Sequence, residues 1–92
     1  MTDKTVSAVL EIKNKKGLHA RAAAAFVKTV EPYDATVEVE RIGQTVSGCS
    51  IMGLMMLAAS QGTTIKVTCS GNQGQDVMAA LEKLLDNKFG ED

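Results

Sequence analysis

The segment Gly-Leu-His-Ala-Arg, residues 17–21, contains the only histidine of the chain and could bind a phosphoryl group. His19 stands where a helix is predicted to begin, and the unpaired N–H groups and positive dipole end of a helix start attract anions. A neutral imidazole also has a ring nitrogen with a free lone pair, which can act as a nucleophile. Arg21 can bring a planar, permanently charged guanidinium to the same anion. The pattern therefore predicts a histidine that accepts a phosphoryl group, with Arg21 and backbone N–H groups holding the added charge.

Gly17 and the residue patterns that the sequence lacks refine this prediction. Gly17 can adopt the positive φ that bulkier residues avoid, and it permits close approach of the backbone. The sequence has no Walker loop for a nucleotide, no evident serine or cysteine triad and, in this segment, no carboxylate cluster for a metal. We therefore expect an acceptor without the machinery to use a donor by itself, with no cofactor or metal, and not an enzyme in the strict sense. The competing interpretation is an exposed or structural histidine, the usual role of an isolated one.

The segment Ser-Ile-Met-Gly-Leu-Met-Met-Leu-Ala-Ala-Ser, residues 50–60, is the second informative stretch. Ser50 is suited to cap the N-terminus of a short helix, predicted over 51–59. One face of this helix can cover a sheet, which leaves three methionines elsewhere around it. Any one of them could fill a gap in the core, but three together favour an exposed protein-binding surface. The residues expected to face the sheet are Ile51, Leu54, Leu57 and Ala58, and the three methionines are Met52, Met55 and Met56.

Apolar periodicity predicts the elements that must position these two segments. Period-two alternation indicates four strands, and helical spacing indicates a helix on each side of the short one. The order β-α-β-β-α-β-α, with one apolar face per strand, predicts an α+β fold in which helices cover one face of an antiparallel sheet and water covers the other. The predicted strands lie at 6–12, 37–40, 44–47 and 65–69, the longer helices at 19–31 and 77–85, and the buried face of the first helix at Ala20, Ala23, Ala24, Val27 and Val30.

Composition and charge limit the classes of partner. The chain has 92 residues, of which 45% are hydrophobic, and we expect a single domain over 1–92. A net charge of -1 and 3% aromatic residues argue against a nucleic-acid partner, and no apolar run is long enough for membrane insertion. Without C-x-x-C spacing, Cys49 and Cys69 are expected to be buried thiols of a cytoplasmic protein. Residues 11–28 are mainly basic and residues 71–92 mainly acidic, which we interpret as two solvated faces.

These features resemble the HPr family, the histidine phosphocarriers of the bacterial phosphoenolpyruvate-dependent phosphotransferase system. The resemblance rests on Gly-Leu-His-Ala-Arg at 17–21, on Ser-Ile-Met-Gly-Leu-Met-Met-Leu at 50–57 and on the order of the elements, and it covers nearly the whole chain. It implies an open-faced β-sandwich with four antiparallel strands and three helices on one face. It implies that enzyme I, which is charged by phosphoenolpyruvate, phosphorylates His19 on Nδ1, and that EIIA-type proteins receive the group. Arg21 would be the active-centre arginine. A carrier that presents one face to successive partners is most simply a monomer.

The resemblance also implies roles for the second segment. The partner surface of the family combines the start of the first helix with the short second helix, which corresponds to Ile51, Met52 and Met55. Ser50 aligns with a regulatory serine that HPr kinase/phosphorylase modifies in some bacteria. A plain helix cap is the alternative role for Ser50, and the two roles are compatible.

Two features leave alternatives open. Ala22 stands where the family usually has proline, and alanine still permits the first helical turn. The tail at 84–92 looks closer to the nitrogen-related branch of the family, whereas 50–55 looks closer to the sugar type, so sugar uptake and regulation are both possible roles.

The competing function from another class is a small regulatory module that holds an anionic metabolite at the N-terminus of the first helix. Such a module would bind a small anion saturably and form no stable phospho-form.

Overall fold

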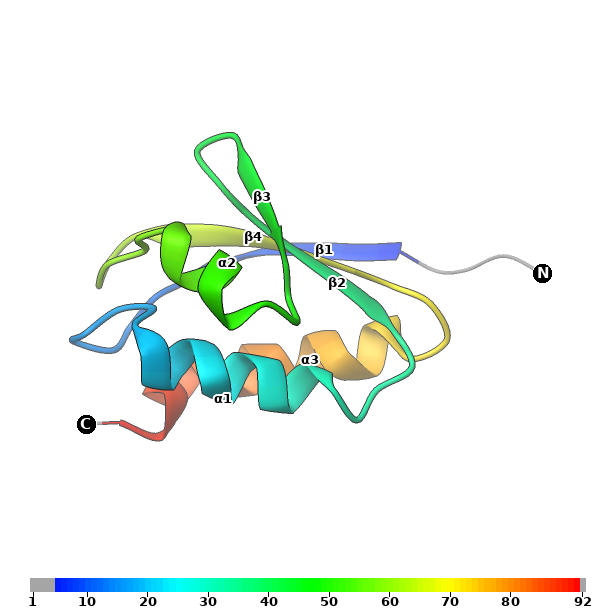
Figure 1. Ribbon diagram of the computed structural model, residues 1–92. Helices are drawn as coiled ribbons and strands as arrows, with labels where there is room; N and C mark the ends of the chain where they lie inside the picture. Colours follow the sequence, from blue (N-terminus) through cyan, green and yellow to red (C-terminus); the bar gives the residue numbers. More distant parts are fainter. Residues whose placement is uncertain (1–4, 92) are drawn as a thin grey trace.

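The computed structural model describes residues 5–91 and shows one four-stranded antiparallel sheet with its helices on one face (Figure 1). The strands are β1 (Thr5–Glu11), β2 (Thr36–Arg41), β3 (Gln44–Ser47) and β4 (Thr64–Ser70). Their order in the sheet is β1-β4-β2-β3, so the first strand in sequence pairs with the last. The predicted α+β open-faced sandwich is confirmed, and so is the order of its elements.

The helices are α1 (Ala20–Val30), α2 (Ile51–Met56) and α3 (Gly74–Asp86), followed by a short 3-10 helix, η1 (Lys88–Gly90). In Figure 1, α1 and α3 lie below the sheet, and α2 lies between the start of α1 and the sheet. The sequence pattern did not predict η1. None of the helices within residues 5–91 is both long and apolar enough to cross a membrane.

The alternation of the strands places their apolar side chains under the helices. In β4, Ile65, Val67 and Cys69 are buried, whereas Lys66 is exposed. The opposite face of the sheet is open, so Val9 of β1 keeps 68% of its surface exposed there. One-sided burial fixes the register, because a slip of one residue would move every core side chain to the solvent face.

The buried stripe of α1 differs from the predicted one. Ala22 and Phe26 are fully buried, whereas Ala20 is exposed and Ala24 is only half-buried. Alanines occur all round this helix, so their spacing does not select a face. The large Phe26 side chain does select it, because turning Phe26 inward removes the most apolar surface from water.

Helix α2 is three residues shorter than predicted, because the chain reverses just after it. Leu57 is the last residue with helical dihedrals, and Ala58 has a left-handed φ of 52°. This geometry is typical of helix C-termini, although glycine is the usual residue there. As a result Leu54 and Leu57 are buried as predicted, but Ala58 and Ile51, which were expected to face the sheet, are exposed.

The two cysteines have different environments. Cys69 is buried in β4, and burial raises the pKa of its thiol to about 11. Cys49 is exposed, so the prediction of a buried thiol was wrong there. Its neighbour Gly48 occupies the inward position of this turn, where an added Cβ would lie only 2.6 Å from Val37 Cγ1. Cys49 is therefore left on the outer side of the turn.

Candidate functional site

The loop between β1 and α1 places His19 at the first turn of the helix. Gly17 has a φ of 68°, and its N–H donates to the carbonyl oxygen of Asn14 at 3.2 Å, which closes the predicted turn. His19 itself is the N-cap of α1, and its carbonyl accepts the first helical hydrogen bond from Ala23 at 2.8 Å. The predicted position of the histidine, at a helix start with unpaired N–H groups, is confirmed.

The same loop lies against the chain segment that follows α2. Leu18 N–H donates to the carbonyl oxygen of Ala59 at 2.8 Å. A Cβ on Gly17 would lie 2.5 Å from that same oxygen and 2.9 Å from Cα of Ser60. The close backbone approach expected of Gly17 is therefore made to its own chain, and it brings the His19 loop beside the end of α2.

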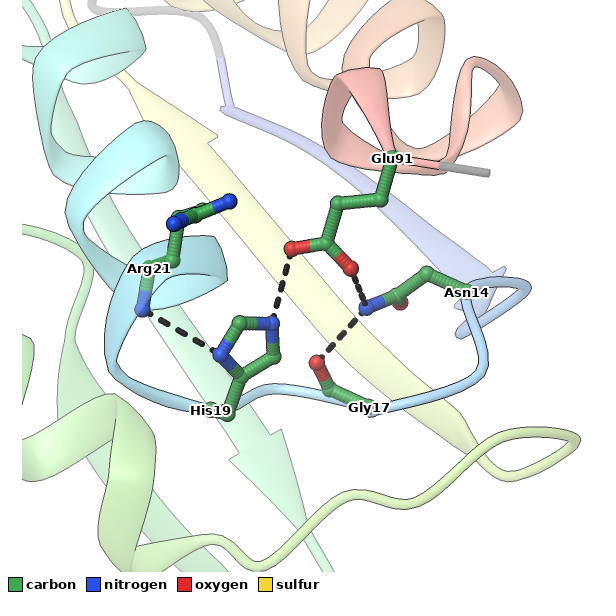
Figure 2. Close-up of polar contacts among 5 residues, drawn as sticks. All are labelled: Asn14, Gly17, His19, Arg21 and Glu91. Carbon is green, nitrogen blue, oxygen red and sulfur yellow. Dashed lines mark hydrogen bonds and ion pairs between the residues drawn. The ribbon is translucent and has the colours of Figure 1, made fainter.

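The two ring nitrogens of His19 have different partners (Figure 2). Nδ1 accepts a hydrogen bond from the Arg21 backbone N–H at 3.3 Å, and Nε2 lies 2.7 Å from Oε2 of Glu91. An ionised carboxylate can only accept, and a backbone N–H can only donate. One neutral tautomer satisfies both partners, with the proton on Nε2 and the lone pair on Nδ1. In this tautomer the lone pair of Nδ1 faces the Arg21 N–H, and the proton on Nε2 faces Glu91.

Glu91 was not among the residues that the sequence singled out. Its Oε1 accepts a hydrogen bond from Nδ2 of the buried Asn14 at 2.9 Å, so both carboxylate oxygens have a donor (Figure 2). The Asn14 amide lowers the pKa of Glu91 most, ahead of the opposing effect of desolvation, and His19 and Lys16 lower it further. The carboxylate is thus held in its ionised form.

An ion pair joins the same two regions. Lys13 Nζ lies 2.6 Å from Oδ1 of Asp86, close to the C-terminal end of α3. Both side chains are exposed, at 40% and 69%, so these two residues are solvated as expected, but the basic loop and the acidic tail also pair with each other. The opposite charges of these two segments were the signal in the sequence that could have indicated this contact.

Arg21 is exposed beside this arrangement. Within residues 5–91 its guanidinium makes no hydrogen bond or ion pair, so the five donors stay available to an anion. A surface pocket of about 460 Å³ adjoins it, and its lining includes two lysines besides Arg21. The lining residues are Lys15, Lys16, His19, Arg21, Phe89, Gly90 and Glu91.

Helix α2 contributes the second predicted feature. Ser50 caps it, since its Oγ accepts a hydrogen bond from the Gly53 N–H at 2.9 Å. The exposed apolar side chains of this helix form a surface that we call the methionine patch. Its members, with their exposed fractions, are Ile51 (40%), Met52 (74%), Met55 (42%) and Met56 (65%).

The structure places His19, Arg21 and Glu91 in one cluster, with α2 and its patch as the neighbouring element. Figure 1 shows α2 beside the first turns of α1. No group of three or more potential metal ligands occurs among the described residues. The arrangement combines a histidine ring, an exposed arginine side chain and an exposed apolar surface.

Comparison with known proteins identifies the family to which this chain belongs. A family model described as the PTS HPr component phosphorylation site matches residues 6–87, which include the His19 loop and all of the sheet except Thr5. The chain is therefore a member of the histidine-containing phosphocarriers. It belongs to the HPr family of the phosphotransferase system.

Individual relatives agree with this assignment. The chain is 45% identical over 83 residues to the phosphocarrier protein HPr of Xylella fastidiosa, covering 90% of this chain and 93% of that one. A crystal structure of HPr from Thermoanaerobacter tengcongensis is 41% identical, with a TM-score of 0.85 over 100% of this chain and 99% of that one. HPr from Bacillus anthracis is 34% identical, with a TM-score of 0.84 over 88% and 96%. Fold and family thus match the resemblance noted in the sequence.

Proposed function

We propose that His19 accepts a phosphoryl group from phosphorylated enzyme I and passes it to EIIA-type proteins in the cytoplasm. The observation that carries the proposal is the geometry of the ring. Its Nδ1 lone pair points to the backbone N–H of Arg21 at the start of α1. A group bound to Nδ1 would therefore lie over the positive end of the helix, with the Arg21 guanidinium free to reach it.

The transfer balances without any other reagent. The Nδ1 lone pair forms the bond to phosphorus, the bond between phosphorus and the donor breaks, and its electron pair leaves with the donor. N–H groups of the first turn of α1 and the Arg21 guanidinium stabilise the negative charge of the phosphoryl oxygens. The reverse displacement by an acceptor protein returns Nδ1 to its starting state.

The methionine patch is the surface that would dock the partner proteins. Three of its members, Ile51, Met52 and Met55, correspond to the partner surface of the family, and all three are exposed. Methionine side chains adapt their shape, which suits a surface that must accept a donor and several acceptors in turn. A carrier that uses this one face for each partner would act as a monomer.

Ser50 would be the regulatory site, as a substrate of HPr kinase/phosphorylase. It caps α2 at the edge of the methionine patch. A phosphate there would meet the N–H groups at the helix start and would add nearly two negative charges beside the docking surface. The cap and the modification site are compatible roles for the same hydroxyl group.

The test is incubation with enzyme I and phosphoenolpyruvate, followed by intact mass measurement. We expect one phosphoryl group on the wild type, labile to acid and stable to base, and none on His19→Asn. Asparagine is the sharper replacement, because it can still cap α1 while lacking a nucleophilic nitrogen. A phosphorylated His19→Asn protein would refute the proposal. Saturable binding of a small carboxylate without any phospho-form would instead support the regulatory module.

A further inference from the structure

We infer that Glu91 is a positioning residue that selects the reactive tautomer of His19 and supports the ring after it has been phosphorylated. This role rests on the proposed function, since it assumes that Nδ1 of His19 accepts the phosphoryl group. Its evidence is separate, however, because it comes from the contacts of Nε2, on the other side of the ring.

The contact between Glu91 and His19 is short and partly shielded from water. The Oε2 to Nε2 distance is 2.7 Å, and the side chains of the histidine and the glutamate are only 28% and 16% exposed. A charge-assisted hydrogen bond of this length is among the stronger ones, and shielding reduces the competition from solvent. The contact is therefore strong enough to bias the position of one ring proton.

The bias has a definite direction. A carboxylate at Nε2 favours the tautomer with its proton on Nε2, so the lone pair remains on Nδ1, next to the N–H of Arg21. The opposite tautomer would place two donors, Nδ1–H and the Arg21 N–H, against each other. Glu91 thus acts on His19 as the buried aspartate acts on the histidine of a serine-protease triad, through orientation and tautomer.

The same carboxylate has a second effect once phosphorus is bound to Nδ1. The ring then has substituents on both nitrogens and carries a positive charge while Nε2 keeps its proton. Glu91 stabilises that cation across the 2.7 Å contact. A protonated ring is the better leaving group, because the imidazole departs as a neutral molecule when an acceptor attacks phosphorus. Glu91 would therefore assist both acceptance and onward transfer.

The chain contains a dedicated support for this carboxylate. Asn14 is fully buried, and its Nδ2 donates both to Oε1 of Glu91 at 2.9 Å and to the Gly17 carbonyl at 2.8 Å. Two acceptors on the same side fix which way the amide points. On the tail, η1 buries Phe89 and contains left-handed dihedrals at Lys88 and Phe89, which turn the chain back toward the loop.

Glu91→Gln is the decisive variant, because the two donors contact different carboxylate oxygens and an amide replaces one of those oxygens with an NH2 group. Asn14 Nδ2 and His19 Nε2–H both donate to the carboxylate in the wild type. If the amide oxygen stays with Asn14, its NH2 group faces Nε2, which must then accept, and the ring proton moves to Nδ1. We expect the glutamine variant to be slower than Glu91→Ala, which leaves both tautomers accessible. Glu82→Gln is the control, since it removes one negative charge from an exposed residue of α3.

Two measurements on these variants distinguish tautomer selection by Glu91 from a role of Glu91 in partner docking. Ring 15N NMR of the free proteins should show Nδ1 moving from a pyridine-type toward a pyrrole-type signal in Glu91→Gln, and no change in Glu82→Gln. Single-turnover phosphorylation by enzyme I should slow by about 10- to 100-fold, by analogy with the loss seen when a residue that orients a metal-binding histidine is removed. The control should keep the wild-type rate.

The possible outcomes lead to different conclusions. If wild type takes up no phosphoryl group, the proposed function itself is wrong. If wild type is phosphorylated and Glu91→Gln behaves like Glu82→Gln in both measurements, the role of Glu91 is wrong and the proposed function stands. A slower transfer with an unchanged 15N spectrum would also overturn the inference, because it would assign Glu91 to partner docking.

Discussion

Gly17→Ala should damage the site more than its small size suggests. The residue has a φ of 68°, and an added Cβ would lie 2.5 Å from the Ala59 carbonyl oxygen. That oxygen already accepts the hydrogen bond from Leu18 that ties the His19 loop to the end of α2. The methyl group therefore strains the loop and also strikes the acceptor of its main anchor. Both neighbours are backbone atoms, which cannot move aside as the end of a flexible side chain can.

The expected cost has two parts. A left-handed dihedral at a residue with a Cβ costs about 1–2 kcal/mol. Forcing a methyl group into a packed contact typically adds about 1–3 kcal/mol. The sum is about 2–5 kcal/mol in the free energy of unfolding, and each kcal/mol lowers the melting temperature of a domain of 60–100 residues by about 4–8 °C. A fall of about 8 °C or more is therefore expected.

Comparison with Gly43→Ala isolates the cost of the packed contact. Gly43 has a similar φ of 76°, but an added Cβ would have no atom within 4 Å. Thermal unfolding of both variants gives the contact cost as their difference, and phosphorylation by enzyme I reports whether the displaced loop still presents His19. The reasoning fails if Gly17→Ala is no less stable than Gly43→Ala. The expected damage to the site is refuted if Gly17→Ala also accepts the phosphoryl group at the wild-type rate.

Three further predictions concern the surroundings of His19. Met55→Glu should weaken enzyme I binding, while the free energy of unfolding changes by no more than about 0.5 kcal/mol because Met55 is 42% exposed. Titration against enzyme I checks this, with Val9→Glu at another exposed position as the control. Unfolding of the Met55 variant would contradict the prediction. Ser50→Asp should keep the helix cap and raise the free energy of unfolding by about 0.3–1 kcal/mol while slowing phosphoryl transfer. Ser50→Ala should lower the free energy of unfolding by about 1 kcal/mol. A wild-type transfer rate for Ser50→Asp would leave Ser50 as a cap alone. The stability advantage of wild type over Glu91→Gln should be complete above the usual pKa of 4.5 and should vanish as the pH falls through the lowered pKa of Glu91, as its contacts with Asn14 and His19 lose the negative charge. Melting curves from neutral pH downward test this, and an advantage that does not decline at all below pH 4.5 would contradict it.

The fold was predictable because burial on one side of a sheet leaves a period-two signal in the sequence. The third strand, Gln44–Ser47, was predicted to the residue, and the others to within two residues at each end. Errors arose where periodicity carries little information. The four alanines after Arg21 do not select a helix face, and the reversal at Ala58 uses a left-handed alanine where a glycine would have signalled the end of the helix.

The site was predictable in its local part only. His19 and Arg21 lie two positions apart, so their relation follows from the geometry of one helix turn. Glu91 is 72 positions from His19. Its approach depends on η1, in which the left-handed dihedrals occur at Lys88 and Phe89 rather than at glycines, so the sequence does not indicate them. The charge segregation of the two segments was visible in the sequence, but charge alone does not say which carboxylate reaches which partner.

The dependence of the site on distant segments has a physical reason. A carrier must offer the same nitrogen to a donor and to several acceptors, so no single partner can be relied on to orient the ring. Three parts of this chain restrict it instead: the Arg21 N–H at Nδ1, the Glu91 carboxylate at Nε2, and the hydrogen bond from Leu18 to Ala59 that holds the loop. Each adds a constraint that does not depend on what is docked on α2. Under the proposed docking on α2, orientation would be separated from recognition, and an adaptable methionine patch would serve different partners without loss of geometry at Nδ1.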